Sequence, residues 1–258
     1  YWKENGIDGW EEYKTIPDRL YIGNAFCHLL FPKEEQLFAL MEKAIVENVE
    51  ITLVFPCMRE FQVEERGKLL IKVDNWCEKR QTRVEILVND WGMTALVKES
   101  GKHLEPCLGV LLNKQKKDPR MRYKKGSTRG LGENNLQADF YRTFLKDTYG
   151  ITRYEWESCG YPQVFPQGKN SLHLPYYQTN TSQYCPLYAS CTAGERGKQR
   201  LPEHCPEYCE QYAYLYPEHL HMAGRYNSLF GLDAELVKHP EKLKAYQQAG
   251  IDRLVIGL

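Results

Sequence analysis

Short apolar segments alternate with longer amphipathic segments along most of the chain. In the first pair, the apolar run at residues 19–24 ends in turn-forming residues, and residues 33–46 then carry Leu37, Leu40 and Met41 at helical spacing. The same order recurs downstream. The pattern predicts strands at residues 19–24, 51–55, 83–90, 107–112, 151–156, 172–174 and 252–257, and helices at residues 33–46, 60–79, 93–100, 136–149 and 240–249.

Strands separated by helices indicate a parallel sheet built from right-handed crossovers. A doubly wound sheet is the alternative, but no Gly-x-Gly-x-x-Gly follows a predicted strand, which weakens a dinucleotide-binding interpretation. Barrels of the TIM class use about 250 residues in one core, close to the 258 residues of this chain. We therefore predict an α/β fold: a single TIM-like (β/α) barrel domain over residues 1–258 that is complete or lacks its first strand.

Residues 175–232 have a different composition. They are rich in Tyr, Cys, Pro, His and Gln and show neither a sustained helical pattern nor an alternating one. A segment without its own apolar core needs another source of stability. We predict an irregular, Cys-rich, metal-binding insertion at 175–232, packed across the C-terminal face of the barrel, where ligands of this fold class assemble.

The charge balance limits the classes of partner. The chain carries 34 basic and 34 acidic side chains, so it lacks the overall basic charge of a typical DNA-binding protein, and we expect no DNA partner. Hydrophobic residues at 42% and charged residues at 26% are ordinary for a folded domain. Residues 114–125 form a local basic strip. We interpret it as a solvated, mobile surface loop, and the alternative is a contact to an anionic substrate or RNA.

The cysteine count bears on the compartment. The chain has 9 cysteines, an odd number. Its first residues, YWKENG, contain no apolar signal-peptide core, and no apolar run is long enough to cross a membrane. We therefore expect no membrane span and a location in the reducing cytoplasm, where clustered cysteines indicate metal or redox chemistry more often than disulfides.

Four of the cysteines fall within the insertion and are spaced C-x5-C-x13-C-x3-C, at Cys185, Cys191, Cys205 and Cys209. Thiolates are soft ligands that suit zinc or an iron–sulfur cluster. The spacing does not choose between these metals, because neither pair has the C-x2-C spacing of common zinc ribbons. Cys27 and Cys57 also follow predicted strands, which places them at the ligand-binding face of a barrel.

Five separated segments carry a likeness to a known family. They read RLYIGNAFC at 19–27, VNDWG at 88–92, LLN at 111–113, YASCTAGER at 188–196 and HCPEYC at 204–209. In this order they resemble the collagenase-like, so-called peptidase, family of TIM-barrel iron–sulfur proteins. Outside these segments the likeness is diffuse.

The resemblance implies a [4Fe-4S] cluster held by Cys27, Cys191, Cys205 and Cys209, with Cys185 as the alternative fourth ligand. It also implies a role in oxygen-independent hydroxylation of a quinone precursor or an RNA base, as an enzyme or as an accessory subunit. A heteromeric partner from the same family is a further expectation. The family name suggests a peptidase, but the chain has no Gly-x-Ser-x-Gly, cysteine-protease or His-Glu-x-x-His signature.

Other polar residues are candidates for chemistry. Arg153, Glu155 and Glu157 alternate along one predicted strand and therefore share a face. If that face lines the barrel lumen, these catalytic candidates could bind or protonate a substrate; if it does not, they form a surface ion pair. The candidate substrate-binding residues Asn89, Asp90 and Asn113 lie at strand ends, where the alternative for the first two is helix capping.

The competing hypothesis from another class is a binding module without catalysis. In it, zinc or a cluster only holds the insertion together, and the barrel serves as a binding surface. A protein that contains iron and sulfide favours the cluster, whereas a colourless protein with one zinc ion favours this structural alternative.

Overall fold

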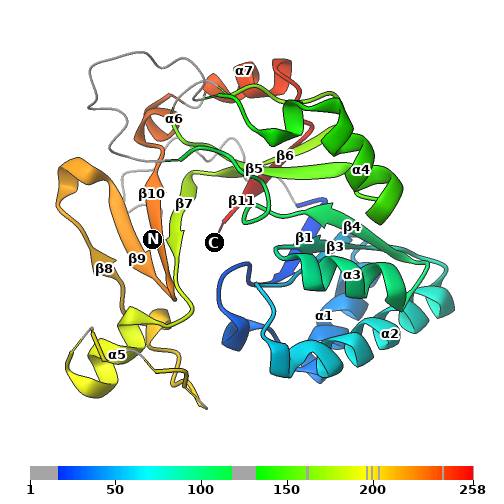
Figure 1. Cartoon of the computed structure of the whole chain (residues 1–258), viewed down its shortest axis with the longest axis horizontal. Coiled ribbons are helices and arrows are strands. Elements are labelled where there is room, and N and C mark those ends of the chain that lie inside the picture. Colours follow the sequence, from blue (N-terminus) through cyan, green and yellow to red (C-terminus); the bar gives the residue numbers. More distant parts are fainter. Residues whose placement is uncertain are drawn as a thin grey trace.

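Seven parallel strands form the main sheet of the computed structural model, which describes residues 17–117, 132–160, 163–195, 197–198, 200–202, 204–239 and 241–257 (Figure 1). Each strand pairs with its neighbours in parallel register. The spatial order is β1 (Arg19–Gly23), β2 (Glu50–Val54), β3 (Val84–Val88), β4 (Leu104–Leu108), β5 (Arg153–Glu157), β6 (Lys169–Leu174) and β11 (Arg253–Ile256). The predicted parallel α/β organisation is therefore confirmed.

Helices cover the outer face of this sheet. They are α1 (Glu34–Val46), α2 (Val63–Arg80), α3 (Trp91–Ser100) and α4 (Asp139–Tyr149), followed near the C-terminus by α6 (Ala234–Lys238) and α7 (Lys242–Gln248). Their buried faces, with Leu37, Met41, Leu70 and Leu145, join strand residues such as Ile86 in one apolar core. In Figure 1, α1, α2 and α3 lie together on one side of the sheet. No helix in the described residues is long and apolar enough to cross a bilayer.

The sheet curls into a half-barrel. Its two edge strands, β1 and β11, are not paired through their backbones in the part of the chain that the structure describes. Their side chains nevertheless meet across the concave face, because Arg253 of β11 donates to the hydroxyl of Tyr21 of β1 at 3.0 Å. The curled sheet is compatible with a TIM-like barrel, but backbone closure is absent from the described strands.

One predicted strand is shifted. We expected residues 107–112, whereas β4 spans Leu104–Leu108 and contains Pro106. Proline has no N–H to donate to a neighbouring strand, so a proline normally ends a predicted strand. Here β4 pairs along its full length with β3 but only at Leu108 with β5. Because β5 takes few hydrogen bonds from β4, the strand tolerates the missing N–H of Pro106.

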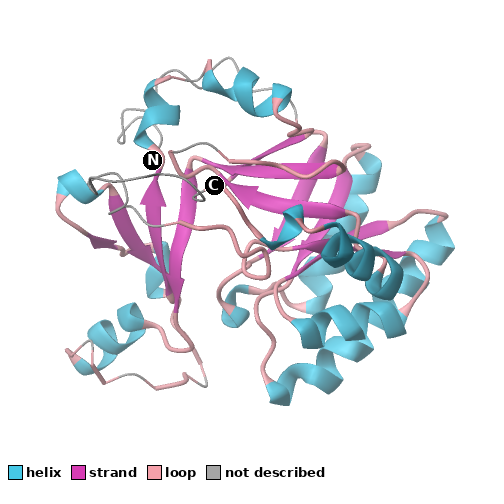
Figure 2. Cartoon of the chain, turned by 45° about the horizontal axis from the view of Figure 1, so that its top comes forward, coloured by secondary structure: helices cyan, strands magenta, loops and turns pink. Residues whose placement is uncertain are grey.

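The segment at 175–232 forms a second sheet, so our expectation of an irregular insertion is wrong. Four antiparallel strands pair in the order β7 (Tyr176–Thr181), β10 (Ser228–Leu232), β9 (Met222–Arg225) and β8 (Tyr214–Leu215). Figure 2 shows them as a layer beside the parallel sheet. Polar strands such as YYQTNT lack an apolar alternation. Tight packing holds them together instead: a Cβ on Gly231 would lie 2.3 Å from the ring of Tyr177.

Candidate functional site

Four cysteines from two parts of the fold converge where the half-barrel meets the antiparallel sheet. Cys27 follows β1, Cys185 is the N-cap of α5 (Pro186–Ala193), and Cys205 and Cys209 come from the loop that ends in the short helix η7 (Tyr208–Glu210). The thiols are close enough to influence one another: burial first, and then Cys27, Cys185 and Cys205, raise the pKa of Cys209 to about 11.

A structural residue joins the two halves of this cluster. The amide of Asn227, in the turn between β9 and β10, donates to the carbonyl of Phe26 at 3.0 Å and to that of Ser182 at 2.7 Å. The first carbonyl lies beside Cys27, and the second lies three residues before Cys185. Phe26 also packs edge-to-face on Phe230 at 5.0 Å. These contacts therefore hold the segment of Cys27 beside that of Cys185.

Backbone N–H groups point at the sulfur atoms. Tyr188 N donates to Cys185 Sγ at 3.3 Å, and Glu207 N lies 3.4 Å from Cys205 Sγ. At Cys27, burial raises the pKa of the thiol, while backbone hydrogen bonds from Leu29 and Leu30 lower it. Such donors stabilise thiolate, the form that binds metal, and hydrogen bonds to sulfur tune iron–sulfur clusters. The donor set therefore fits a thiolate-bound metal group.

The sulfur atoms are spread too widely for a single ion in their present positions. Among the described residues, the one group of three Cys, His or carboxylate donors within 4.8 Å of one another is Glu85, Cys107 and Glu155. Sulfurs around a tetrahedral zinc would be roughly 3.8 Å apart, given Zn–S bonds of about 2.3 Å. No three of the four sulfurs lie within 4.8 Å of one another, so in these positions they do not form a tetrahedral zinc site.

Cys191 lies differently from the other candidate ligands. It is exposed on α5. Its charge contributes to the raised pKa of Cys185, after burial and Cys205. Its role as a ligand stays a prediction, and the geometry favours Cys185 beside Cys27, Cys205 and Cys209.

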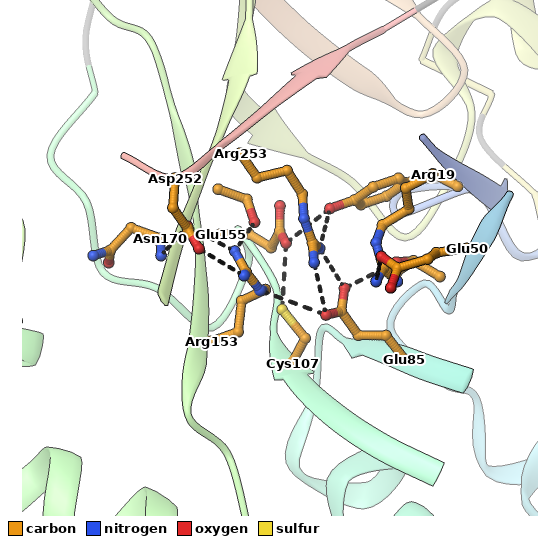
Figure 3. Close-up of polar contacts among 12 residues, drawn as sticks. Arg19, Glu50, Glu85, Cys107, Arg153, Glu155, Asn170, Asp252 and Arg253 are labelled. Atoms are coloured by element: carbon orange, nitrogen blue, oxygen red, sulfur yellow. Dashed lines mark hydrogen bonds and ion pairs between the residues drawn. The ribbon is translucent and has the colours of Figure 1, made fainter. Parts of the chain in front are cut away.

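Arg153 and Glu155 face the lumen of the half-barrel, not the outer surface (Figure 3). Arg153 makes two hydrogen bonds to Asp252, of 2.9 and 2.8 Å, and one to Ser171 of 3.0 Å. Glu155 is fully buried and accepts from Cys107 at 3.3 Å and from Tyr21 at 3.2 Å. These two predicted candidates therefore belong to an internal network.

His173 is the third hydrogen-bond partner of Glu155, beside Tyr21 and Cys107. Its Nε2 lies 2.5 Å from Glu155 Oε2. Burial alone would raise the pKa of Glu155, but the charge and hydrogen bond of His173, helped by Cys107 and Arg253, bring it below its ordinary value. Glu155 is thus held as a carboxylate at neutral pH, which fits a structural or basic role better than that of a proton donor.

The Glu85, Cys107 and Glu155 group is a poor cation site despite its compactness. Arg253 lies 2.7 Å from one oxygen of Glu85, and Arg153 lies 3.6 Å from the other. The thiol of Cys107 keeps its proton, because burial raises its pKa well above the ordinary value. Two guanidinium groups therefore already occupy the space and balance the charge that a metal ion would require.

Glu157, the third candidate of β5, lies further toward the C-terminal end of the strand. It forms an ion pair with Lys117, and the two side chains are only 4% and 7% exposed. The backbone N–H of Gln178 donates to the same carboxylate at 2.8 Å. The expected solvated basic strip is therefore wrong at Lys117, because this lysine finds a buried acid; residues 118–125 of the strip lie outside the described residues.

Asn89 and Asp90 mainly organise the backbone. Asn89 is buried and donates to Phe55 O at 2.8 Å. Asp90 caps α3 by accepting from Met93 N at 2.7 Å, which is the capping alternative weighed from the sequence. Asn113 donates to the carbonyl of Glu155 at 2.8 Å and borders the cavity described next.

A cavity of about 580 Å³ opens at the C-terminal ends of the parallel strands. Its walls come from the loops after β1, β2 and β4 and from the strand β7 with the loop after it. It includes Phe26 and Gln183, which neighbour Cys27 and Cys185 in the sequence. The volume is within the usual range for small-molecule sites, about 300–1,000 Å³. We call it the mouth cavity.

Sequence reasoning missed Tyr21, Lys117 and His173. The alternation of side chains along a strand could have placed Tyr21 and His173 on the lumen face, since each is flanked by apolar residues on the opposite face. Lys117 carries no such signal, because its burial depends on a strand that begins 36 residues later.

Comparison of this chain with protein-family models, with curated proteins and with solved structures finds no match. The arrangement of the site residues is therefore the basis of the functional proposal.

Proposed function

We propose that this chain is an iron–sulfur protein that takes part in oxygen-independent hydroxylation, with a quinone precursor or an RNA base as the substrate class. The observation that carries the proposal is the convergence of Cys27, Cys185, Cys205 and Cys209 beside the mouth cavity. The half-barrel would then be a variant of the TIM-like fold, and the family resemblance supports a partner subunit of the same kind.

The proposed division of labour follows from position. A bound [4Fe-4S] cluster would supply one-electron transfer at the edge of the mouth cavity. Glu157 does not line the mouth cavity; it would instead position Lys117 and Gln178, which do line it, beside a substrate. Arg153 and Glu155 would hold the strands around it, since their partners are other lumen side chains.

The second candidate is a metal-stapled binding module. It is supported by the sparse core of α5 and the following loop, where Leu187, Ala189 and Cys209 are the buried apolar residues among those described between 186 and 213. Metal binding can replace such a core, because the binding free energy becomes folding free energy. In this case zinc or a cluster would stabilise the segment without chemistry in the mouth cavity.

Metal analysis of protein purified without oxygen separates these proposals. We expect iron and acid-labile sulfide in near-equal amounts, and loss of both in Cys27→Ser. Cys57→Ser is the matched control, because Cys57 is also a cysteine after a strand and lines the mouth cavity. One zinc ion per chain, unaffected by Cys27→Ser, would support the stapled module and contradict the iron–sulfur proposal.

A further inference from the structure

The mouth cavity is lined by cationic side chains and by no carboxylate among its described residues. Arg59, Lys114 and Lys117 contribute positive charge. Glu157 lies behind the wall and neutralises Lys117. Two cationic groups therefore remain for the interior of the cavity.

Neither of these groups has an acidic partner in the described part of the chain. Arg59 donates to the backbone carbonyl of Gln183, which is uncharged. Lys114 is exposed and takes part in no ion pair among the described residues. Elsewhere in the lumen, each arginine pairs with a carboxylate, as Arg153 does with Asp252. The arginines of the lumen network are thus paired with carboxylates, whereas the two cations of the mouth cavity have no acidic partner among the described residues.

Cys57, which also lines the cavity, lies near both cations. At Cys57, burial and Asp90 raise the pKa of the thiol, while Arg59 and Lys114 act in the opposite direction. Asp90 is the nearby acid, and its two oxygens are already used by the backbone N–H groups of Met58 and Met93.

The rest of the mouth-cavity wall is suited to contact with the uncharged part of a ligand. Phe26, Met58, Val110 and Leu111 supply apolar surface. The nearby amides are largely committed: Gln115 bonds both the carbonyl and the N–H of Glu157, at 2.6 and 3.0 Å. Charge and apolar contact are therefore the main means of recognition available.

We propose that the mouth cavity binds a small organic anion, a carboxylate or a phosphate monoester carried on an apolar or aromatic body, with Arg59 and Lys114 as the anion-binding side chains. The inference rests on the proposed function in taking this cavity as the substrate site, and it narrows the substrate to an anionic one. A cation in a partly desolvated cavity strengthens binding of an anion and excludes neutral analogues.

Another use of the same charges must be separated experimentally. Arg59 lies between the cavity and the loop that carries Cys185, so its charge could instead offset that of thiolates bound to a metal. In that case Arg59→Gln would lower the iron content and leave the binding of anions unchanged.

The test is a titration of the full chain with three probes of similar shape: benzoate, phenyl phosphate and the neutral benzamide. We expect saturable binding of at least one anion, at least about tenfold tighter than that of benzamide, and about tenfold weaker binding to Arg59→Gln and to Lys114→Gln. Lys244→Gln, an exposed lysine of α7, is the control and should bind as the wild type does. The stronger of the two anions identifies the preferred acidic group.

Three outcomes would overturn the inference: equal affinity for benzoate, phenyl phosphate and benzamide, no saturable binding of either anion, or unchanged affinity in both variants. Iron is measured on the same samples. Anion binding without iron would overturn the proposed function alone, whereas iron without anion binding would overturn only this inference.

Discussion

The lower lumen is the network around Glu85, Glu155 and Arg253. It is polar, as is the mouth of the half-barrel, but the two regions differ in whether their charged side chains have ionic partners. In the lower lumen, Glu85 accepts from Thr52 at 2.9 Å and from Arg253 at 2.7 Å. At the mouth, Arg59 has a carbonyl partner and Lys114 has no ionic partner among the described residues. A network whose members satisfy one another is suited to holding strands together, whereas unmatched charge beside a cavity is suited to binding.

The same contrast applies to the sulfur atoms. Cys107 is fully buried in the lower lumen and donates a hydrogen bond to Glu155 at 3.3 Å. At the mouth, Cys27, Cys185 and Cys205 accept backbone N–H groups. Cys185 also donates to the carbonyl of Tyr226 at 3.0 Å. The mouth cysteines therefore differ from Cys107 in having backbone N–H donors at sulfur, which stabilise a thiolate once the proton is lost.

The largest expected effect on stability is in the lower lumen. Arg253→Met would leave Glu85 buried with its main ionic partner removed, and breaking a buried pair in this way costs about 3–5 kcal/mol. Urea denaturation followed by circular dichroism measures the change. A loss of less than about 1 kcal/mol would contradict the view that this network holds the sheet in its curled form.

The next largest effect on stability is expected at Lys117, and Lys114 of the same basic strip serves as its comparison. Lys117→Gln leaves the buried Glu157 without its ion pair, so we expect a loss of about 2–4 kcal/mol in the free energy of unfolding. Lys114→Gln removes an exposed charge that has no ionic partner among the described residues, and it should change this free energy by about 0.5 kcal/mol or less. The same urea experiment on both variants checks this. Equal effects would contradict the distinction between them.

A smaller effect concerns pH. The folded-state pKa of Glu155 is lowered, so this carboxylate stabilises the fold above its unfolded pKa of about 4.3, and the contribution is lost as the pH falls through the folded value. The destabilisation by Glu155→Gln should therefore be greatest near neutrality and shrink in acid. Urea midpoints of both proteins across the acid range measure it. A destabilisation that does not decrease in acid would contradict the assignment.

The parallel sheet was predictable because its strands are apolar and recur between amphipathic helices. Strand β2 reads EITLV with four buried residues, and the predicted range differs by one residue at each end. The antiparallel sheet was not predictable, because the stability of β7 depends on its partner β10 and on Tyr177 packing over Gly231. Local patterns report on apolar faces and not on pairings between distant polar strands.

The candidate site shows the same limit. Cys27, Cys205 and Cys209 were identified from spacing and resemblance, and the structure brings them together. The sequence left Cys185 as the alternative to Cys27 for the fourth ligand, and it could not show that the fold brings these two cysteines together. Likewise, the shared face of Arg153, Glu155 and Glu157 was predictable, but its direction toward the lumen required the fold.

The central claim is that Cys27, Cys185, Cys205 and Cys209 hold an iron–sulfur cluster beside the mouth cavity. The direct test is the iron and acid-labile sulfide content, under anaerobic conditions, of the wild type, Cys185→Ser and Cys191→Ser. We expect about four iron and four sulfide ions per chain in the wild type and in Cys191→Ser, and a severe loss of both in Cys185→Ser. Full content in Cys185→Ser together with loss in Cys191→Ser would contradict the ligand set, and a wild type without iron or sulfide would contradict the cluster itself.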